Sequence, residues 1–227
     1  SKAVKALGGE TIVLGFIAGR NGRLIKDTLN SRGIDHNFVE VPGETRVSVK
    51  IFEEDGRHTD INEPGFSVSE ASYQVLLGRL RTYLKPGNIV VISGLTPPDL
   101  PNERYYDMCK MVTDAGIPLI VDADAEHIEW ALKAHPTFVK PVARELSEMV
   151  GIPTTDKQFA HKGAHLLLDR GAKGVLVSLG TKGAVYATEK VKYYAEGPDI
   201  KMTNPTGAGD AFVGALAHAL EQNMTHE

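Results

Sequence analysis

The stretch Thr203-Asn204-Pro205-Thr206-Gly207-Ala208-Gly209-Asp210 carries the strongest signal in this chain, and it opens a segment of helical character over 211–220. The three small residues from Gly207 to Gly209 let backbone N–H groups approach an anion closely, and the positive end of the helix points at the same place. A carboxylate is costly there, and an aspartate beside a bound phosphate can accept the proton of an attacking hydroxyl. Alternatively, Asp210 only stabilises the N-terminus of the helix.

A second glycine-containing turn lies upstream. Residues 174–178 are an apolar run that predicts a buried strand, residues 179–183 form a turn with two glycines and a hydroxyl, and 184–187 predict another strand. A Ser-Leu-Gly-x-x-Gly turn at a strand end suits a nucleotide phosphate or ribose. Its alternative is an ordinary hairpin turn, which the turn taken alone favours.

Strands and helices alternate through most of the chain. The expected strands cover 11–16, 88–93, 119–122, 137–140, 175–178 and 184–187, and the expected helices cover 1–7, 22–32, 69–83, 102–115, 126–134, 143–150, 159–170 and 211–220. Helices of this length between strands imply right-handed crossovers and a mainly parallel sheet with helices on both faces. Ser93, Asp122, Lys140 and Ser178 stand at the carboxyl ends of strands, where open α/β sheets bind ligands.

Residues 34–62 interrupt this alternation. Short strands are expected over 35–41, 45–53 and 57–61, with a hairpin turn signal at 54–56. Apolar and polar residues alternate over 47–51, which is typical of a strand with one buried face. We expect a small, mostly antiparallel sheet that projects from the main domain, with Phe52 as an apolar contact for a partner.

Five segments in this order resemble the ribokinase-like, or PfkB, carbohydrate kinases, and they span nearly the whole chain. Two are the glycine turns described above. The others are Glu44-Thr45-Arg46-Val47-Ser48-Val49-Lys50-Ile51, Ile61-Asn62-Glu63-Pro64-Gly65 and Ile92-Ser93-Gly94-Leu95-Thr96-Pro97-Pro98. These three are similar to the branch that phosphorylates sugar phosphates, which holds 1-phosphofructokinase and tagatose-6-phosphate kinase.

The resemblance implies a ribokinase-like three-layer α/β/α fold with a mainly parallel sheet and a small β lid. The kinase core would comprise 1–33 and 63–227, and the lid would comprise 34–62, covering the sugar and able to mediate a homodimer. Family members carry an earlier strand and more helix after the last segment. The resemblance therefore also implies that the core is truncated at both ends.

The resemblance assigns the catalytic and nucleotide-binding residues. The reaction would be in-line transfer of the γ-phosphoryl group of ATP to a sugar-phosphate hydroxyl, with Asp210 as the base. The N–H groups of Gly207, Ala208 and Gly209 would stabilise the phosphoryl group. The residues that would line the nucleotide site are Ser178, Gly180, Gly183 and Thr206.

The acceptor site would contain Arg46 and Ser93, and the acceptor would be fructose 1-phosphate or tagatose 6-phosphate. A guanidinium binds phosphate through paired hydrogen bonds, so Arg46 suits the phosphate that the acceptor already carries. The alternative for Arg46 is a surface charge paired with Asp60 or Glu63.

The sequence departs from the family at the metal. The family's Asn-x-x-Glu element, which positions Mg²⁺ through water, becomes Val142-Ala143-Arg144-Glu145. Glu145 is present, but valine cannot hydrogen-bond a metal-bound water, which puts full activity in doubt. Asp124 also stands in a segment that differs from the family, and we expect it to cap the helix over 126–134 rather than to add charge near the phosphates. The eight histidines show no zinc-binding spacing.

Composition fits a globular enzyme of the cytoplasm. The net charge of −4 suggests no nucleic-acid or membrane-surface partner. The single Cys109 excludes an internal disulfide framework and fits a reducing compartment. No apolar run approaches the ~18 residues of a membrane span, and no signal peptide is visible.

Two other functions remain open. A non-catalytic sugar-phosphate or nucleotide-binding protein on the kinase scaffold is favoured by Val142 and disfavoured by the intact segment from Gly207 to Asp210. A nucleoside kinase of the same superfamily is disfavoured by Arg46, because an acceptor without phosphate needs no such arginine.

Overall fold

The computed structural model describes residues 1–53, 57–200 and 206–224. The expected turn at 54–56, the side chain of Phe52 and residues 203–205 of the opening stretch lie outside what it describes. Contacts divide the chain into two compact units, of which the first comprises Ser1, 10–83 and 97–100, and the second comprises 2–9, 84–96 and 101–227. Each unit has its own strands, and each is described in turn.

Unit 1 contains a parallel strand pair joined by a helix. Strand β1 (Ile12–Ile17) leads through helix α2 (Gly19–Asn30) to strand β2 (Asp35–Glu40), and β2 pairs with β1 in parallel from Ile12 opposite Asp35. The expectation that 35–41 belongs to an antiparallel sheet is therefore wrong. The physical reason is burial, because Val39 and Val41 pack with Ala18 and with Leu76 of helix α3 (Glu70–Arg81) in one apolar cluster.

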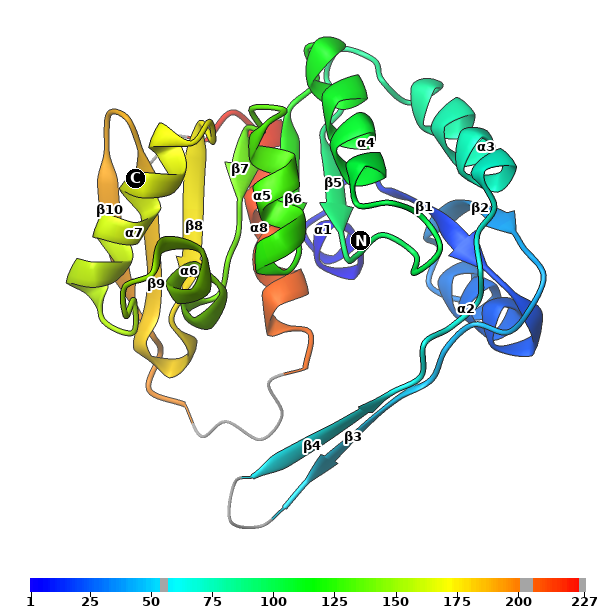
Figure 1. Cartoon of the computed structure of the whole chain (residues 1–227), viewed down its shortest axis with the longest axis horizontal. Helices are drawn as coiled ribbons and strands as arrows, with labels where there is room; N and C mark the ends of the chain where they lie inside the picture. The colour runs from blue at the N-terminus through cyan, green and yellow to red at the C-terminus, as the bar shows by residue number, and fades with distance from the viewer. Residues whose placement is uncertain (54–56, 201–205, 225–227) are drawn as a thin grey trace. The chain divides into compact units, whose positions relative to one another are not determined.

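Strands β3 (Ser48–Phe52) and β4 (His58–Asn62) form the antiparallel part of unit 1, with Val49 opposite Ile61 (Figure 1). Helix α3 follows and begins after Ser69, whose hydroxyl accepts a hydrogen bond from the backbone N–H of Ser72. Ser69 is therefore the N-cap residue of α3.

Unit 2 contains a six-stranded sheet in the order β10-β9-β8-β7-β6-β5. Strands β5 (Val90–Ser93), β6 (Leu119–Asp122), β7 (Phe138–Val139) and β8 (Gly174–Ser178) are parallel, and β9 (Gly183–Thr188) and β10 (Lys192–Glu196) are added antiparallel. The prediction of a mainly parallel sheet is confirmed. Strand β10 was not expected, because it is mostly exposed and its sequence has no clear alternation of apolar and polar residues.

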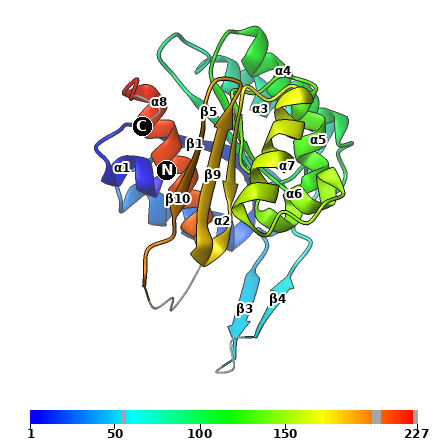
Figure 2. The same ribbon diagram turned by 90° about the vertical axis from the view of Figure 1, so that its left-hand side faces the viewer.

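Helices cover both faces of this sheet, as Figure 2 shows. Helix α8 (Ala208–Glu221) and the short α1 (Lys2–Ala6) lie on one face, and α5 (Ala125–Leu132), α6 (Ala143–Val150) and α7 (Lys157–Asp169) lie on the other. Helix α4 (Glu103–Asp114) contacts both α5 and β6. The unit therefore has three layers.

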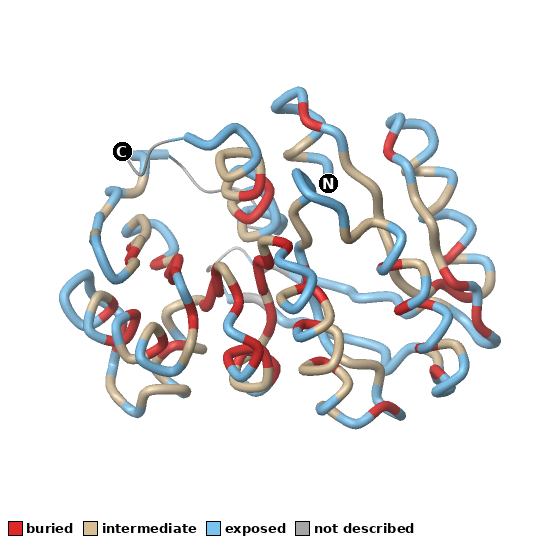
Figure 3. The backbone as a smooth tube through the Cα atoms, turned by 90° about the horizontal axis from the view of Figure 1, so that it is seen from above, coloured by how far each residue is buried: buried red, intermediate tan, exposed pale blue. Residues whose placement is uncertain are grey.

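The core of unit 2 lies on both sides of its central strands. Ile120 and Phe138 pack against Val213 and Ala217 of α8. Leu119, Val121 and Val139, which point to the opposite face by strand alternation, are fully buried. Figure 3 shows such buried residues in red along the backbone. Within the described parts of the chain, no helix combines the length and the hydropathy needed to cross a bilayer.

Candidate active site

The opening stretch forms the N-terminus of helix α8. Gly207 is the N-cap residue and has a left-handed backbone with φ of 86°, which favours glycine. Its carbonyl accepts a hydrogen bond from the N–H of Ala211 at 2.9 Å. The N–H groups of the first turn have no acceptor within the helix, so they can bind an anion. Helix α8 begins at Ala208, three residues before the expected position, and Asp210 is exposed in its first turn.

Helix α8 begins beside the carboxyl ends of β6 and β7. Lys140 directly follows β7, is only 3% exposed, and forms an ion pair with Asp122 at the end of β6, with 2.9 Å between Nζ and Oδ1. A Cβ built on Gly209 would lie 3.6 Å from the Lys140 Nζ. The first turn of α8 therefore meets the edge of the sheet where the sequence predicted a ligand site. Sequence reasoning noted Lys140 at this edge but gave it no role.

The two other predicted edge residues lie at the same end of the parallel strands. Ser93 is the exposed last residue of β5 and pairs in register with Asp122. Ser178 is the last residue of β8, and its N–H donates to the carbonyl of Pro141 at 3.3 Å. Thr206 lies in the turn before Gly207. The nucleotide and acceptor roles of these residues stay predictions.

The turn after Ser178 connects β8 to β9 as a hairpin. It contains one turn of 3-10 helix, η1 (Gly180–Lys182), and the N–H of Leu179 donates to the carbonyl of Gly183 at 2.9 Å. The hairpin alternative is therefore correct as a description of the backbone. It does not exclude a nucleotide at the same turn.

Gly180 and Gly183 have different structural requirements. Gly183 has φ of 109°, and a Cβ there would lie 1.9 Å from the carbonyl oxygen of Ala195 on β10. Gly180 also has a left-handed backbone, with φ of 63°, but a Cβ there would meet no atom of the described residues within 4 Å. The fold alone therefore requires glycine at 183, whereas Gly180 leaves open space at the turn.

Glu145 lies in the first turn of α6 and serves its helix. Its Oε2 accepts a hydrogen bond from the N–H of Val142 at 2.8 Å, and Val142 is the N-cap residue of that helix. Burial raises the pKa of the Glu145 carboxyl, with Val142 N–H and the Lys140 ammonium acting in the opposite direction. Within the described segments, no cluster of three or more His, Cys, Asp or Glu side chains is arranged to hold a metal.

The surroundings of Glu145 fit a cation that is bound through water molecules rather than one coordinated by protein side chains alone. Mg²⁺ keeps several waters and uses few carboxylates when phosphates are its other ligands. Glu145 has only Oε2 engaged in a hydrogen bond among the described residues, so Oε1 is available to a metal-bound water. Valine at 142 supplies no second polar group beside it.

Asp124 caps helix α5, as expected. Its Oδ1 accepts from the backbone N–H of His127 at 3.0 Å and lies 2.7 Å from His127 Nδ1. The other ring nitrogen of His127 accepts from the backbone N–H of Thr96 at 3.0 Å. Nδ1 therefore carries the proton of the neutral imidazole and donates to Asp124. This buried histidine connects α5 to the loop that follows Ser93, a link that the sequence pattern did not reveal.

In unit 1, the antiparallel pair of β3 and β4 forms a ribbon, and Glu44 and Thr45 connect the chain just before this ribbon to α2. The Glu44 carboxylate accepts from the N–H groups of Arg20 and Asn21 at 3.0 and 2.6 Å, and these hydrogen bonds lower its pKa. The Thr45 hydroxyl accepts from the N–H of Ala18 at 2.9 Å. Two of the three residues in the Glu44–Arg46 motif therefore have a structural role.

Arg46 is exposed and lies over Gly65, whose Cβ would be 3.5 Å from the Arg46 Cβ. The ion pairs considered as its alternative role are not formed. Asp60 pairs with Lys50 at 2.9 Å, and Glu63 accepts from the N–H of Val47 at 2.8 Å. Arg46 has no ion-pair or hydrogen-bond partner among the described residues, so its guanidinium is available to a ligand.

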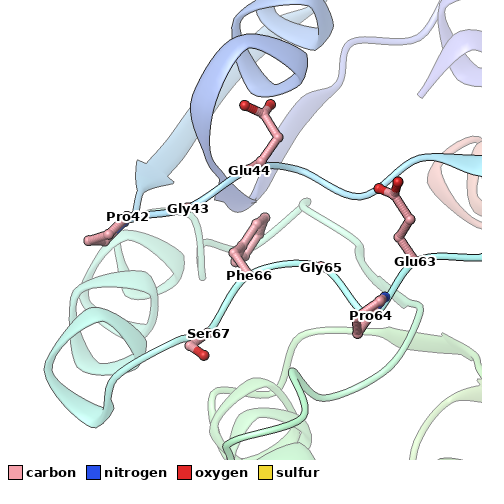
Figure 4. Close-up of a pocket in the computed structure, with 8 residues that line it drawn as sticks. All are labelled: Pro42, Gly43, Glu44, Glu63, Pro64, Gly65, Phe66 and Ser67. Atoms are coloured by element: carbon pink, nitrogen blue, oxygen red, sulfur yellow. The ribbon is translucent and has the colours of Figure 1, made fainter.

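A pocket of about 550 Å³ opens beside this motif, still within unit 1 (Figure 4). Two segments line it, Pro42-Gly43-Glu44 and Glu63-Pro64-Gly65-Phe66-Ser67. Its two side-chain charges are carboxylates, and both already accept backbone hydrogen bonds. The pocket therefore offers room next to Arg46 but no cation of its own for a phosphate.

The model of the family described as pfkB family carbohydrate kinase matches residues 1–227, the whole chain. The chain belongs to the pfkB family of carbohydrate kinases. The resemblance drawn from the five segments is thereby confirmed, and the protein is an ATP-dependent sugar kinase. Family membership implies ATP and a divalent cation as cofactors.

Individual relatives narrow the similarity to phosphofructokinases. The kinase is 31% identical to the 1-phosphofructokinase of Bacillus subtilis (strain 168) over 94% of this chain and 70% of that protein. It is also 31% identical to the 1-phosphofructokinase of Escherichia coli (strain K12) over 100% of this chain and 73% of that protein.

Solved structures agree with this family and with the ribokinase-like α/β fold. The kinase superposes on the tetrameric inhibited form of phosphofructokinase-2 from Escherichia coli with a TM-score of 0.90 and 29% identity, covering 99% of this chain and 74% of that one. The same bacterial kinase in complex with fructose-6-phosphate gives a TM-score of 0.88 and 28% identity, with the same coverage.

The glycine turn of this kinase provides a first prediction. Gly183→Ala places a methyl group against the Ala195 carbonyl in a backbone conformation that only glycine adopts readily, and we expect it to lower the free energy of unfolding by more than ~3 kcal/mol. Gly180→Ala, the matched variant, has only its left-handed backbone to overcome and should lose about 1–2 kcal/mol. Denaturant unfolding of both variants measures the difference, and equal losses would contradict the assignment of Gly183 to the hairpin.

Proposed function

We propose that this kinase transfers the γ-phosphoryl group of ATP to a hydroxyl of a ketohexose phosphate, with fructose 1-phosphate as acceptor and fructose 1,6-bisphosphate as product. The observation that carries the proposal is the N-terminus of α8. There a left-handed Gly207, an unhindered Gly209 and a carboxylate at Asp210 meet the carboxyl edge of the sheet. The similarity to the 1-phosphofructokinases supports the choice of acceptor.

Asp210 is the base in this proposal. Its carboxylate accepts the proton of the acceptor hydroxyl while that oxygen attacks the phosphorus atom of the γ-phosphoryl group. The bond between phosphorus and the bridging oxygen of ADP breaks, and ADP leaves. Negative charge on the transferring oxygens is stabilised by the N–H groups at the start of α8 and by the positive end of the helix.

The nucleotide lies along the turn after β8 in this proposal, against Ser178, Gly180 and Thr206. The open space beside Gly180 supports this placement. Gly183 supports it only indirectly, by fixing the hairpin. Mg²⁺ is the divalent cation that we propose, held through water by Glu145, and when bound it neutralises charge on the phosphates.

Arg46 and Ser93 bind the acceptor. The guanidinium of Arg46 suits the phosphate that the sugar already carries, since paired N–H donors match phosphate oxygens. Its lack of an ion pair among the described residues supports this role. We take β3 and β4 as the lid of this kinase, and 34–40 as part of the α/β core.

Tagatose 6-phosphate is an alternative acceptor. Fructose 6-phosphate is another, because a related structure contains that sugar phosphate. A non-catalytic binding protein is the alternative of another class, and Val142 is the residue that favours it. We also propose a cytoplasmic location, since Cys109 is a buried free thiol.

The lid is the surface that we propose for a homodimer. Val47, Val49, Ile51 and Ile61 are each roughly half exposed. By strand alternation and register they share one face of the ribbon. An exposed apolar face of this kind fits a second copy of the chain.

An acceptor panel tests the proposed function. ADP formation by the intact protein with ATP and Mg²⁺ should show the highest kcat/KM for fructose 1-phosphate, above tagatose 6-phosphate, fructose 6-phosphate, fructose and adenosine. Phosphate-free acceptors should be poor, because they leave Arg46 without a partner. A preference for a sugar or a nucleoside without phosphate would overturn the proposal, and no turnover with any acceptor would favour the binding protein.

Replacing the proposed base tests the chemistry. Asp210→Asn keeps the size and exposure of the side chain but cannot accept the proton, so kcat should fall by about 10²- to 10⁴-fold. The KM for ATP should change only a few-fold, because a base acts mainly in the transition state. Retention of more than a tenth of the wild-type kcat would remove Asp210 from this role.

Arg46 has a matched control on the same ribbon. Arg46→Ala should raise the KM for the sugar phosphate by about 10- to 100-fold and leave that for ATP nearly unchanged, because a charge-assisted hydrogen-bond pair is lost. Lys50→Ala removes a neighbouring cation that already pairs with Asp60, and it should change neither KM. If Arg46→Ala alters only thermal stability, the acceptor-phosphate assignment is wrong.

Restoring the amide at 142 tests the metal site. Val142 is an N-cap residue without a side-chain acceptor, so Val142→Asn should stabilise α6 by about 1 kcal/mol and raise the melting temperature. The Asn side chain would also supply a hydrogen bond to a metal-bound water. The Mg²⁺ concentration for half-maximal rate should therefore fall, within the 10–100-fold range typical of such outer contacts.

The two effects of Val142→Asn separate its outcomes. A raised melting temperature with an unshifted magnesium curve would mean that the amide caps the helix and plays no part at the metal. Acceptor preference serves as the control and should not change, since residue 142 belongs to the nucleotide and metal side of the site.

A further inference from the structure

Lys140, a buried cation of unit 2, has no role in the proposed function. Its side chain is 3% exposed at the end of β7. Its backbone N–H donates to the carbonyl of Val121 at 2.9 Å, which fixes its position at the edge of the sheet. Burying an ammonium group is unfavourable unless opposite charge compensates it. Asp122 supplies one carboxylate at 2.9 Å.

The Lys140 ammonium also lies beside the first turn of α8. A Cβ on Gly209 would contact the Lys140 Nζ at 3.6 Å, so the ammonium lies directly against the first turn of the helix. The start of a helix carries positive partial charge. Two positive groups therefore converge on one place. Among the described residues Asp122 is the ion-pair partner of the ammonium, and Glu145 interacts with it electrostatically without an ion pair. An anion between the ammonium and the helix N-terminus would satisfy both.

Gly209 leaves room for such an anion. Its backbone is not left-handed, unlike that of Gly207, so helix geometry does not require glycine at 209. Apart from the backbone of α8 itself, the Lys140 Nζ is the one atom of the described residues within 4 Å of the position that a Cβ would occupy. The absence of a side chain keeps the space between the ammonium and the backbone N–H groups open to a phosphate oxygen.

We propose that Lys140 is a catalytic residue that binds an oxygen of the transferring phosphoryl group. The inference rests on the proposed function. As the bond from phosphorus to the ADP oxygen breaks and the bond to the acceptor oxygen forms, Lys140 stabilises the negative charge on the phosphoryl oxygens. The acceptor proton goes to Asp210, and Lys140 keeps its own protons throughout.

The central test replaces the ammonium and separates kcat from nucleotide binding. Lys140→Met should lower kcat by about 10²- to 10³-fold, the usual effect of losing one donor to a developing oxyanion, with the KM for ATP changed only a few-fold. Lys140→Arg should recover part of the rate because it keeps the charge. Lys173→Met is the control, since Lys173 is exposed in the same unit, and it should behave as wild type.

A binding measurement gives a readout that does not depend on turnover. Isothermal titration calorimetry with ADP, Mg²⁺ and aluminium fluoride, a mimic of the phosphoryl group in transfer, should show tight binding to the wild type. Lys140→Met should weaken the binding of this combination by the same factor as kcat, and weaken that of ADP alone only a few-fold. Equal affinities of wild type and variant for the fluoride complex would overturn the proposal.

A second set of variants separates catalysis from stability. Lys140→Met leaves the Asp122 carboxylate without its partner and can unfold the protein for that reason alone. The double variant with Asp122→Asn and Lys140→Met removes both charges, so it should fold and still be slow. Gly209→Ala should fold normally and lower kcat by filling the space. A double variant or a Gly209→Ala variant with wild-type kcat would overturn the proposal and leave Lys140 as the structural partner of Asp122.

The outcomes distinguish this inference from the proposed function. Wild-type turnover of a sugar phosphate with an equally active Lys140→Met variant would refute the role of Lys140 and leave the proposed function standing. An inactive wild type whose binding of ADP and aluminium fluoride still depends on Lys140 would support the phosphoryl site and refute the acceptor assignment.

Discussion

The contact between the first turn of α8 and the buried Lys140–Asp122 ion pair is the constraint on which the proposed chemistry of this kinase depends. Strands β6 and β7 end side by side and deliver the carboxylate and the ammonium to one edge of the sheet. Gly207 turns the chain so that α8 begins at the same edge, and Val213 and Ala217 pack the helix onto Ile120 and Phe138. Apolar packing thereby brings the first turn of α8, with its backbone N–H groups and Asp210, to the edge of the sheet that holds the Lys140 ammonium.

Much of this arrangement could be predicted from the sequence. The sequence defined 119–122 and 143–150 to the residue. The first three residues of β6 form a buried apolar run, and α6 ends at a left-handed Gly151. The sequence also predicted that Ser93, Asp122, Lys140 and Ser178 share one edge of the sheet, because each stands at the carboxyl end of an expected strand. The glycines at the start of α8 likewise predicted an anion site, since this feature depends only on residues that are neighbours in the sequence.

What could not be predicted depends on contacts between distant residues. Strand β2 was assigned to the wrong sheet because its sequence shows no alternation that would indicate a partner strand. The packing of Val39 and Val41 with Ala18 and Leu76 places it beside β1. Gly183 was taken as a nucleotide residue, but its need for glycine arises from Ala195 on the unexpected strand β10. The link from His127 to Thr96, and the closeness of Lys140 to Gly209, leave no sequence signal either.

One measurement tests the central claim most directly, a crystal structure of the intact kinase with ADP, Mg²⁺, aluminium fluoride and fructose 1-phosphate. The account predicts the fluoride plane against the N–H groups of Gly207 to Gly209 and the Lys140 ammonium, with a sugar hydroxyl hydrogen-bonded to Asp210. A fluoride group bound elsewhere, or an Asp210 carboxylate directed away from the sugar, would contradict it.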